Sequence, residues 1–292
     1  MSKEKQYSRR SVLQTVAGGV IGGPVAASLT LGQERQASGK INGNLKQSVC
    51  KWCYKDMSVE QLAYEAARIG LKSVELLGPE DWPVLKKYGL TCAMGSGAGP
   101  IENGLNRKEN HERWIHNLRK HIELAPDLGI PSVICFSGNR NGMSDEEGLE
   151  NCLIAIKQVV GVAEKKGVNV CMELLNSKVN HKDYMCDHTV WGVKLVKQVG
   201  SPRFKLLYDI YHMQIMEGDV IRTITENWDY IAHFHTGGNP GRNEIDDTQE
   251  LNYKAICKAI VEKGYSGYLA QEFIPKRDPM TSLAQAFRIC DV

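Results

Sequence analysis

The sequence has little net charge and no extreme of composition. Its 292 residues include 36 Lys and Arg against 34 Asp and Glu, which leaves a net charge of +2. Proteins that bind the nucleic-acid backbone usually carry a strong basic excess, so we expect no nucleic-acid partner. A hydrophobic content of 42% excludes an intrinsically disordered chain. Only 10 Pro, with 28 Gly, exclude a collagen-like or low-complexity protein.

Beyond its N-terminal region the sequence lacks any apolar run long enough to cross a bilayer. Within that region, the pair Arg9-Arg10 precedes an uncharged stretch rich in small residues, with a cleavage motif at 25–27. This pattern is similar to a twin-arginine signal peptide. We therefore predict a signal peptide at 1–32, a polar linker at 33–46, and a periplasmic or otherwise exported protein. The alternative is an uncleaved leader that anchors the protein to a membrane.

From residue 47 to 292, short β-rich runs alternate with helical patterns eight times. The predicted strands are residues 48–54, 73–77, 90–94, 132–136, 168–172, 204–208, 231–234 and 267–270. This alternation predicts parallel βαβ units, and eight of them in about 250 residues favour a single-domain α/β protein with a (β/α)8 TIM barrel. An open doubly wound sheet is the alternative, but no Gly-rich phosphate turn follows the first predicted strand. Ser58, Ser144 and Asp187 are predicted helix caps.

Four consecutive predicted strands end in a residue that can bind a hard metal ion. They are Glu173, Asp209, His235 and Glu272. Active sites of TIM barrels lie where strands end, so we expect these side chains to converge. Three carboxylates and one imidazole form an oxygen-rich set, which suits a divalent metal, Mn²⁺ or Mg²⁺, better than Zn²⁺. The alternative for each residue is a helix cap or an ion pair with Arg.

Other histidines, tryptophans and cysteines are predicted to be structural. We expect His233 to lie on the opposite face of its strand from His235, outside the site. Trp52 and Trp82 either line an apolar wall or lie in the core, and we favour the core. Nine Cys include a Cys-x-x-Cys at 50–53, but its place on a predicted strand is unfavourable for thioredoxin-like redox chemistry.

Three segments carry a resemblance to a known family. They are residues 172–177 (MELLNS), 208–214 (YDIYHMQ) and 235–244 (HTGGNPGRNE). Together they resemble the hydroxypyruvate isomerase family of the xylose-isomerase-like TIM barrels. Ketose epimerases of these barrels carry His at the position of His235, whereas many hydroxypyruvate isomerases carry Gln, so the substrate stays open.

The resemblance implies the reaction and the residues that perform it. It implies a metal-dependent sugar or keto-acid isomerase or epimerase that transfers a proton through an enediolate. Metal contacts are implied at the four strand-end residues, an acid/base pair at Glu173 and Glu272, and substrate contacts at His212 and Arg242. The implied partner is a small sugar or hydroxy-keto acid, with no membrane contact after signal cleavage and, by family analogy, a homo-oligomer.

Three other functions remain open at this point. An endonuclease for abasic DNA has the same barrel, but needs more His ligands and a basic groove. A dehydratase acting on cyclic polyols could use the same metal site. An exported sugar-binding barrel without activity would not need both strand-end glutamates.

Overall fold

The computed structural model describes residues 41–292. The predicted signal peptide at 1–32 and most of the predicted linker at 33–46 lie outside these residues, so both remain predictions. Across residues 41–292, no helix is both long and apolar enough to cross a bilayer.

Eight parallel strands form one sheet in the order β2-β1-β8-β7-β6-β5-β4-β3. Isolated bridges Ser73–Thr91 and Leu77–Gly95 join the two outermost strands, so the sheet nearly closes into a barrel. The strands are β1 (Lys46–Cys50), β2 (Ser73–Glu75), β3 (Gly95–Ala98), β4 (Ser132–Cys135), β5 (Asn169–Glu173), β6 (Phe204–Asp209), β7 (Ile231–Thr236) and β8 (Tyr268–Gln271). The predicted TIM barrel is confirmed.

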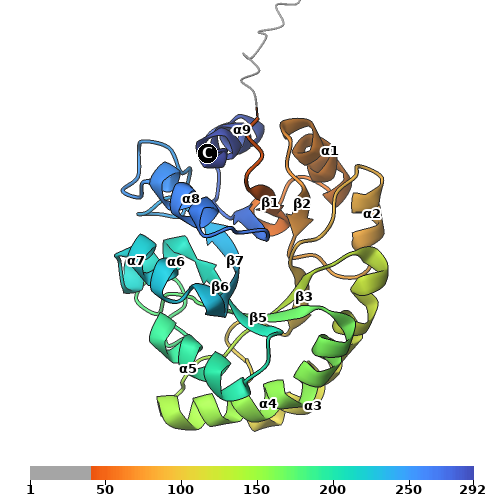
Figure 1. The fold of residues 1–292 in the computed structure, drawn as a ribbon, viewed down its shortest axis with the longest axis vertical. Helices are drawn as coiled ribbons and strands as arrows, with labels where there is room; N and C mark the ends of the chain where they lie inside the picture. Colours follow the sequence, from red (N-terminus) through yellow and green to blue (C-terminus); the bar gives the residue numbers. More distant parts are fainter. Residues whose placement is uncertain (1–40) are drawn as a thin grey trace, which may run out of the picture. The chain divides into compact units, whose positions relative to one another are not determined.

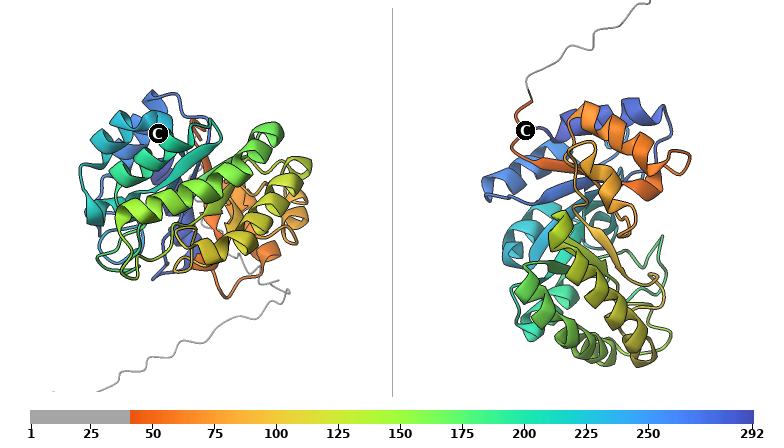
Figure 2. Two further views of the ribbon diagram at one scale, coloured as in Figure 1. Left: turned by 90° about the horizontal axis from the view of Figure 1, so that it is seen from below. Right: turned by 90° about the vertical axis from the view of Figure 1, so that its right-hand side faces the viewer.

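The helices lie around the outside of this barrel, as Figures 1 and 2 show. They are α1 (Val59–Ile69), α2 (Trp82–Lys86), α3 (His111–Leu124), α4 (Asp145–Lys166), α5 (Thr189–Val199), α6 (Ile210–Met216), α7 (Val220–Glu226), α8 (Tyr253–Glu262) and α9 (Pro279–Cys290). The sequence pattern did not predict α6 and α7. Helix α6 begins directly after β6 because the Asp209 side chain caps it, accepting a hydrogen bond from the His212 backbone N–H at 3.0 Å.

Two of the three predicted helix caps are confirmed. Ser58 forms a full capping box with Gln61 at the start of α1, and Ser144 accepts a hydrogen bond from the Glu147 backbone N–H at the start of α4. The third prediction is wrong, because His188 is the N-cap residue of α5. The Asp187 carboxylate instead accepts hydrogen bonds from Arg140 and Ser177, so it does not cap the helix.

The third strand lies at 95–98, and not at 90–94 as predicted. A Cβ atom on Gly97 would lie 1.8 Å from the backbone oxygen of Ile134, so only glycine lets this strand approach β4 so closely. The first strand also ends earlier than predicted, because Lys51–Cys53 form a 3₁₀ turn.

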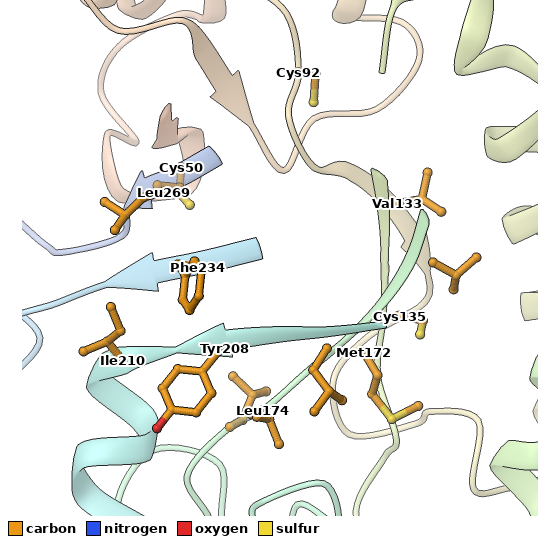
Figure 3. Packing of buried hydrophobic residues seen from close by; sticks show 14 of the residues in the cluster. Cys50, Cys92, Val133, Cys135, Met172, Leu174, Tyr208, Ile210, Phe234 and Leu269 are labelled. Atoms are coloured by element: carbon orange, nitrogen blue, oxygen red, sulfur yellow. The ribbon is translucent and has the colours of Figure 1, made fainter. Parts of the chain in front are cut away.

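Side chains alternate between the two faces of each strand, and this alternation separates the core from the site. Tyr208, Phe234 and Leu269 are register neighbours on β6, β7 and β8, and all three are fully buried toward the helices. Figure 3 shows them side by side. On the inner face, Met94, Ile134, Cys171 and Leu207 form a small separate cluster that fills the barrel.

Candidate functional site

The four predicted metal ligands meet at the C-terminal end of the barrel. Glu173, Asp209, His235 and Glu272 are all buried, and each offers a ligand atom within 4.8 Å of the others. Side chains two residues apart on a strand point to the same face, which explains this convergence. Glu173 and Asp209 follow Cys171 and Leu207 of the inner cluster by two residues. The structure therefore brings together the set that the strand ends predicted.

The His235 ring is oriented by a fourth acidic residue, Glu75. Its Nε2 lies 2.9 Å from Glu75 Oε1, whereas its Nδ1 lies 3.1 Å from Glu173 Oε1 and 2.7 Å from Glu272 Oε2. Burial raises the pKa of Glu75, but the charges and hydrogen bonds of His233 and His235 outweigh it and lower the pKa to about 2. Glu75 is therefore an ionised acceptor for the proton on Nε2. Burial lowers the pKa of His235, but the charge of Glu272 and the hydrogen bonds with Cys50 and Glu173 outweigh it and raise that pKa well above its usual value, so without a metal ion both ring nitrogens donate. A metal ion on Nδ1 would replace the proton there and leave the one on Nε2.

The prediction that His233 faces away from the site is wrong. Its Nε2 lies 2.8 Å from the same Glu75 oxygen, because residues two apart on a strand share a face. Sequence reasoning missed both His233 and Glu75 as parts of the site. The signal for Glu75 was present, since it ends the short strand β2 as Glu173 ends β5.

Arg242 lies inside the cluster. Its Nη2 donates to Asp209 Oδ2 at 3.1 Å and to a Glu272 carboxylate oxygen, and its Nε donates to the Glu272 backbone oxygen at 3.1 Å. The residue is only 7% exposed, which excludes a solvated loop arginine. Its φ of 58° lies in the left-handed region that non-glycine residues rarely adopt, as is common where a loop positions a functional side chain.

His212 contacts Arg242 and does not line the cavity at the site. Its Nε2 lies 2.6 Å from Arg242 Nη1, and its Nδ1 accepts a hydrogen bond from the Asn176 backbone N–H at 3.2 Å. Burial and the charge of Arg242 lower the pKa of His212 well below its usual value, so the ring is neutral. Of the two predicted substrate contacts, Arg242 therefore borders the cavity and His212 supports it.

The nearby positive charges are too few for Glu173, Asp209 and Glu272 all to ionise. Burial raises the pKa of Asp209 to about 8, and burial together with the charge of Glu272 raises the pKa of Glu173. Burial also raises the pKa of Glu272, but the charges of Arg242 and His235 outweigh it and hold that pKa well below its usual value. A divalent cation among these oxygens would let all three carboxyl groups ionise, so the donor set fits such an ion.

A cavity of about 660 Å³ opens onto the cluster. Glu173, Glu272 and Arg242 line it, whereas Asp209 and His235 do not. Trp52 also lines it, and its indole N–H donates to Glu272 Oε1 at 2.6 Å. The preference for a core position is therefore wrong for Trp52, which is 36% exposed, and correct for the buried Trp82.

A second cavity of about 690 Å³ lies between residues 245–254 and α9. It contains none of the four clustered side chains. We therefore take the cavity over the cluster as the functional one, because it combines concavity with convergent ionisable groups.

Comparisons with known proteins agree with this fold. Residues 63–290 match the family model described as a xylose isomerase-like TIM barrel. A hydroxypyruvate isomerase from Escherichia coli (strain K12) is 27% identical over 226 residues, which cover 76% of this chain and 80% of that protein. A 2-oxo-tetronate isomerase from Cupriavidus necator is 32% identical over 227 residues, which cover 72% of this chain and 85% of that protein.

A solved structure described as an AP endonuclease of family 2 from Brucella melitensis has a TM-score of 0.74 and 24% sequence identity, covering 82% of this chain and 98% of that chain. At this identity the likeness shows the fold alone. The curated relatives are named as isomerases, and the family model spans most of the chain. This protein is therefore an enzyme of the isomerase class and belongs to the xylose isomerase-like TIM barrel family.

Proposed function

We propose that this enzyme is a divalent-metal-dependent isomerase or epimerase, similar to hydroxypyruvate isomerase. It moves a proton from a carbon beside a carbonyl group in a sugar or keto-acid substrate. The observation that carries this proposal is the convergence of three carboxylates and one imidazole at the barrel mouth.

Glu173, Asp209, His235 and Glu272 would hold the ion, which we propose to be Mn²⁺ or Mg²⁺. When bound, a divalent cation stabilises the negative charge that develops on the substrate oxygens in an enediolate. The orientation of His235 favours this arrangement, because Glu75 holds the proton on Nε2 while Nδ1, beside the carboxylates, would be available to the ion once its own proton is lost.

Glu173 and Glu272 are proposed as the acid/base pair. Both line the cavity and so can reach a bound substrate, whereas Asp209 and His235 lie behind them. One glutamate takes the proton from the carbon beside the carbonyl, and one of the pair returns it to the neighbouring carbon or to the other face of the same carbon. A positioned general base of this kind typically contributes 10²–10⁴-fold to the rate.

Arg242 and Trp52 are proposed to fix the base and the substrate. The Trp52 indole and the Arg242 guanidinium bond different oxygens of Glu272, so its carboxylate has little freedom to rotate. Arg242 also borders the cavity, and although most of its N–H groups bond Asp209, His212 and Glu272, the second N–H of Nη1 can donate to a carbonyl or hydroxyl oxygen of a substrate.

The test is hydrogen–deuterium exchange in D₂O, followed by NMR over a panel of ketoses, keto acids and inositol derivatives. We expect deuterium beside a carbonyl with the wild type, and at least a ~100-fold slower exchange with Glu173→Gln. Glu112→Gln, an exposed change on α3, serves as the matched control. Loss of water from an inositol derivative without such exchange would instead indicate the polyol dehydratase, and no bound metal by mass spectrometry would contradict the metal site.

We also propose export by the twin-arginine route, with the leader at 1–32 removed. The support is the Arg9-Arg10 pair before an uncharged segment. Replacing both arginines by lysine in a bacterial host should retain the protein in the cytoplasm, as fractionation and immunoblotting would show. Equal export of both forms would contradict the proposal, and a full-length membrane-bound product would indicate the uncleaved anchor.

A further inference from the structure

The cavity over the cluster has two chemically different sides. The strands β5 to β8 contribute its buried charges, whereas the opposite side is formed by segments at the ends of β1 to β5. We call that side the apolar wall. It consists of Trp52, Leu76, Ile101, Ile134, Phe136 and Leu175.

The charges of the cavity leave no cation for an anionic substrate. Among the described residues that line it, Arg242 is the one permanently cationic side chain, and most of its donors already bond Asp209, His212 and Glu272. Glu102 adds a further acidic group at the rim. Even with a divalent ion in place, the four carboxylates outnumber the positive charges of the ion and the guanidinium by one. A carboxylate or a phosphate on the substrate would therefore lack a cationic partner.

One residue of the apolar wall, Leu76, has an unfavourable backbone conformation. Leu76 has a φ of 60°, in the left-handed region that leucine rarely adopts, and its N–H is held by the Met94 backbone oxygen at 2.8 Å. This strained conformation directly follows Glu75, the partner of His235, and places a half-buried apolar side chain on the cavity. Strain of this kind persists where the surrounding structure holds a side chain for a function.

The size of the cavity also exceeds what a small keto acid needs. A volume of about 660 Å³ lies within the range that holds drug-sized ligands. A small keto acid bound at the carboxylates would leave the apolar wall in contact with water, which is unfavourable.

We propose that the substrate of this site is an uncharged keto-sugar that carries an apolar substituent. The sugar carbonyl lies at the carboxylate cluster, and the substituent packs on the apolar wall. The inference rests on the proposed function, since it names the substrate of the same proton transfer. It separates this enzyme from its relatives named for hydroxypyruvate and 2-oxo-tetronate, both of which are anions.

The first test compares binding by isothermal titration calorimetry to the Mn²⁺-loaded protein. The probes are phenyl 3-oxo-β-D-glucopyranoside, its methyl counterpart and hydroxypyruvate. Burial of the phenyl ring should tighten binding over the methyl glycoside on the order of tenfold or more. Hydroxypyruvate should bind more weakly than either. Equal affinity of the two glycosides, or tightest binding of hydroxypyruvate, would overturn the inference.

Two variants test separately whether the apolar wall binds the phenyl group and whether the charge of Glu102 weakens the binding of an anion. Ile101→Ser should reduce the phenyl-to-methyl affinity ratio several-fold and leave the methyl glycoside unchanged, while the exposed Val190→Ser on α5 changes neither. Glu102→Lys should strengthen hydroxypyruvate binding roughly three- to tenfold, with Glu102→Gln between it and the wild type. An unchanged affinity ratio in Ile101→Ser would also overturn the inference.

Deuterium exchange on the same probes separates the inference from the proposed function. Preferred binding of the phenyl glycoside without any exchange would support the inferred ligand and contradict the proton transfer. Faster exchange with hydroxypyruvate than with either glycoside would support the proton transfer and overturn the inferred substrate.

Discussion

Single residues set the geometry of this site through contacts between distant strands. Glu75 on β2 accepts hydrogen bonds from two histidines of β7, which lie more than 150 residues away along the chain. It does not line the cavity over the cluster, so it acts through His235 as a positioning residue. Such partners behind a metal ligand fix its tautomer and are typically worth 10–100-fold in metal affinity.

We expect Glu75→Gln to weaken Mn²⁺ binding about 10–100-fold, because an amide no longer enforces the proton on His235 Nε2. Calorimetric titration with Mn²⁺ would measure the affinity, and ¹⁵N NMR of the Mg²⁺-loaded protein would report the His235 tautomer. His233→Asn, which leaves the Glu75–His235 bond intact, is the matched comparison and should have the smaller effect. An unchanged tautomer and affinity in Glu75→Gln would show that Glu75 is merely structural.

At the scale of helices and strands, caps and loop contacts place each element on the barrel. Ser58 and Gln61 exchange hydrogen bonds of 3.1 and 2.8 Å at the start of α1, so two backbone N–H groups there find side-chain acceptors. Between β4 and α5, Arg140 bonds Asp145 and Asp187 and so joins two loops at the same end of the barrel.

Ser58→Ala should lower the free energy of unfolding by about 1 kcal/mol, because the Gln61 backbone N–H loses its acceptor. Urea denaturation followed by circular dichroism would measure this loss. Ser144→Ala at the start of α4 removes an equivalent cap and should cost a similar amount. A loss below about 0.3 kcal/mol in both variants would contradict the role of the caps.

The Asp187 contact predicts a pH dependence of stability. Burial raises the pKa of Asp187, but hydrogen bonds from Arg140, Ser177 and His188 outweigh it and lower the pKa below its usual value. Since the folded pKa lies below the unfolded value of about 3.9, the stabilisation is present above that pH and is lost as the pH falls further.

Asp187→Asn should therefore be less stable than the wild type at pH 7, with the difference shrinking below about pH 4. Free energies of unfolding measured in urea from pH 7 to 3 would show this convergence. Parallel curves over the whole range would rule out the contribution of the ionised carboxylate.

For the whole molecule, stability depends on packing without disulfide bonds and on the proposed metal ion. All nine Cys lie within the described residues, and all are buried and unpaired. Burial raises the pKa of several of these thiols, including Cys135 and Cys186, which makes them poor nucleophiles.

A charged maleimide should leave the native protein almost unlabelled and modify all nine thiols after unfolding in guanidinium. Mass spectrometry would count the labels, and a reductant should not change the Tm. Rapid labelling of the native protein, or a Tm that falls with reductant, would contradict nine buried free thiols.

Metal should stabilise the loaded protein by mass action. At a concentration of 100 Kd, Mn²⁺ should add about 2.7 kcal/mol to the free energy of unfolding, seen as a higher Tm than after chelation. Asp209→Asn should lose most of this gain, whereas Asp229→Asn, an exposed site before β7, should retain it. An equal gain in both variants would place the ion elsewhere.

Local patterns in the sequence determined the architecture. Strand-length apolar runs between helical patterns predicted the eight-stranded barrel, and the residues that end four strands predicted the cluster. Ser58 with Gln61 predicted a capping box that the structure contains. These features are readable because period, capping and chain order depend on residues close together along the chain.

Tertiary structure alone decided the features that depend on distant partners. Strand β3 can lie against β4 because position 97 is glycine, since the Ile134 backbone oxygen leaves no room for a Cβ atom. Asp187 binds Arg140 and does not cap a helix. Glu75 joins His233 and His235 only once β2 and β7 face the same barrel interior. The energy of a buried charge or a close backbone approach depends on what surrounds it in space, and no local pattern contains that information.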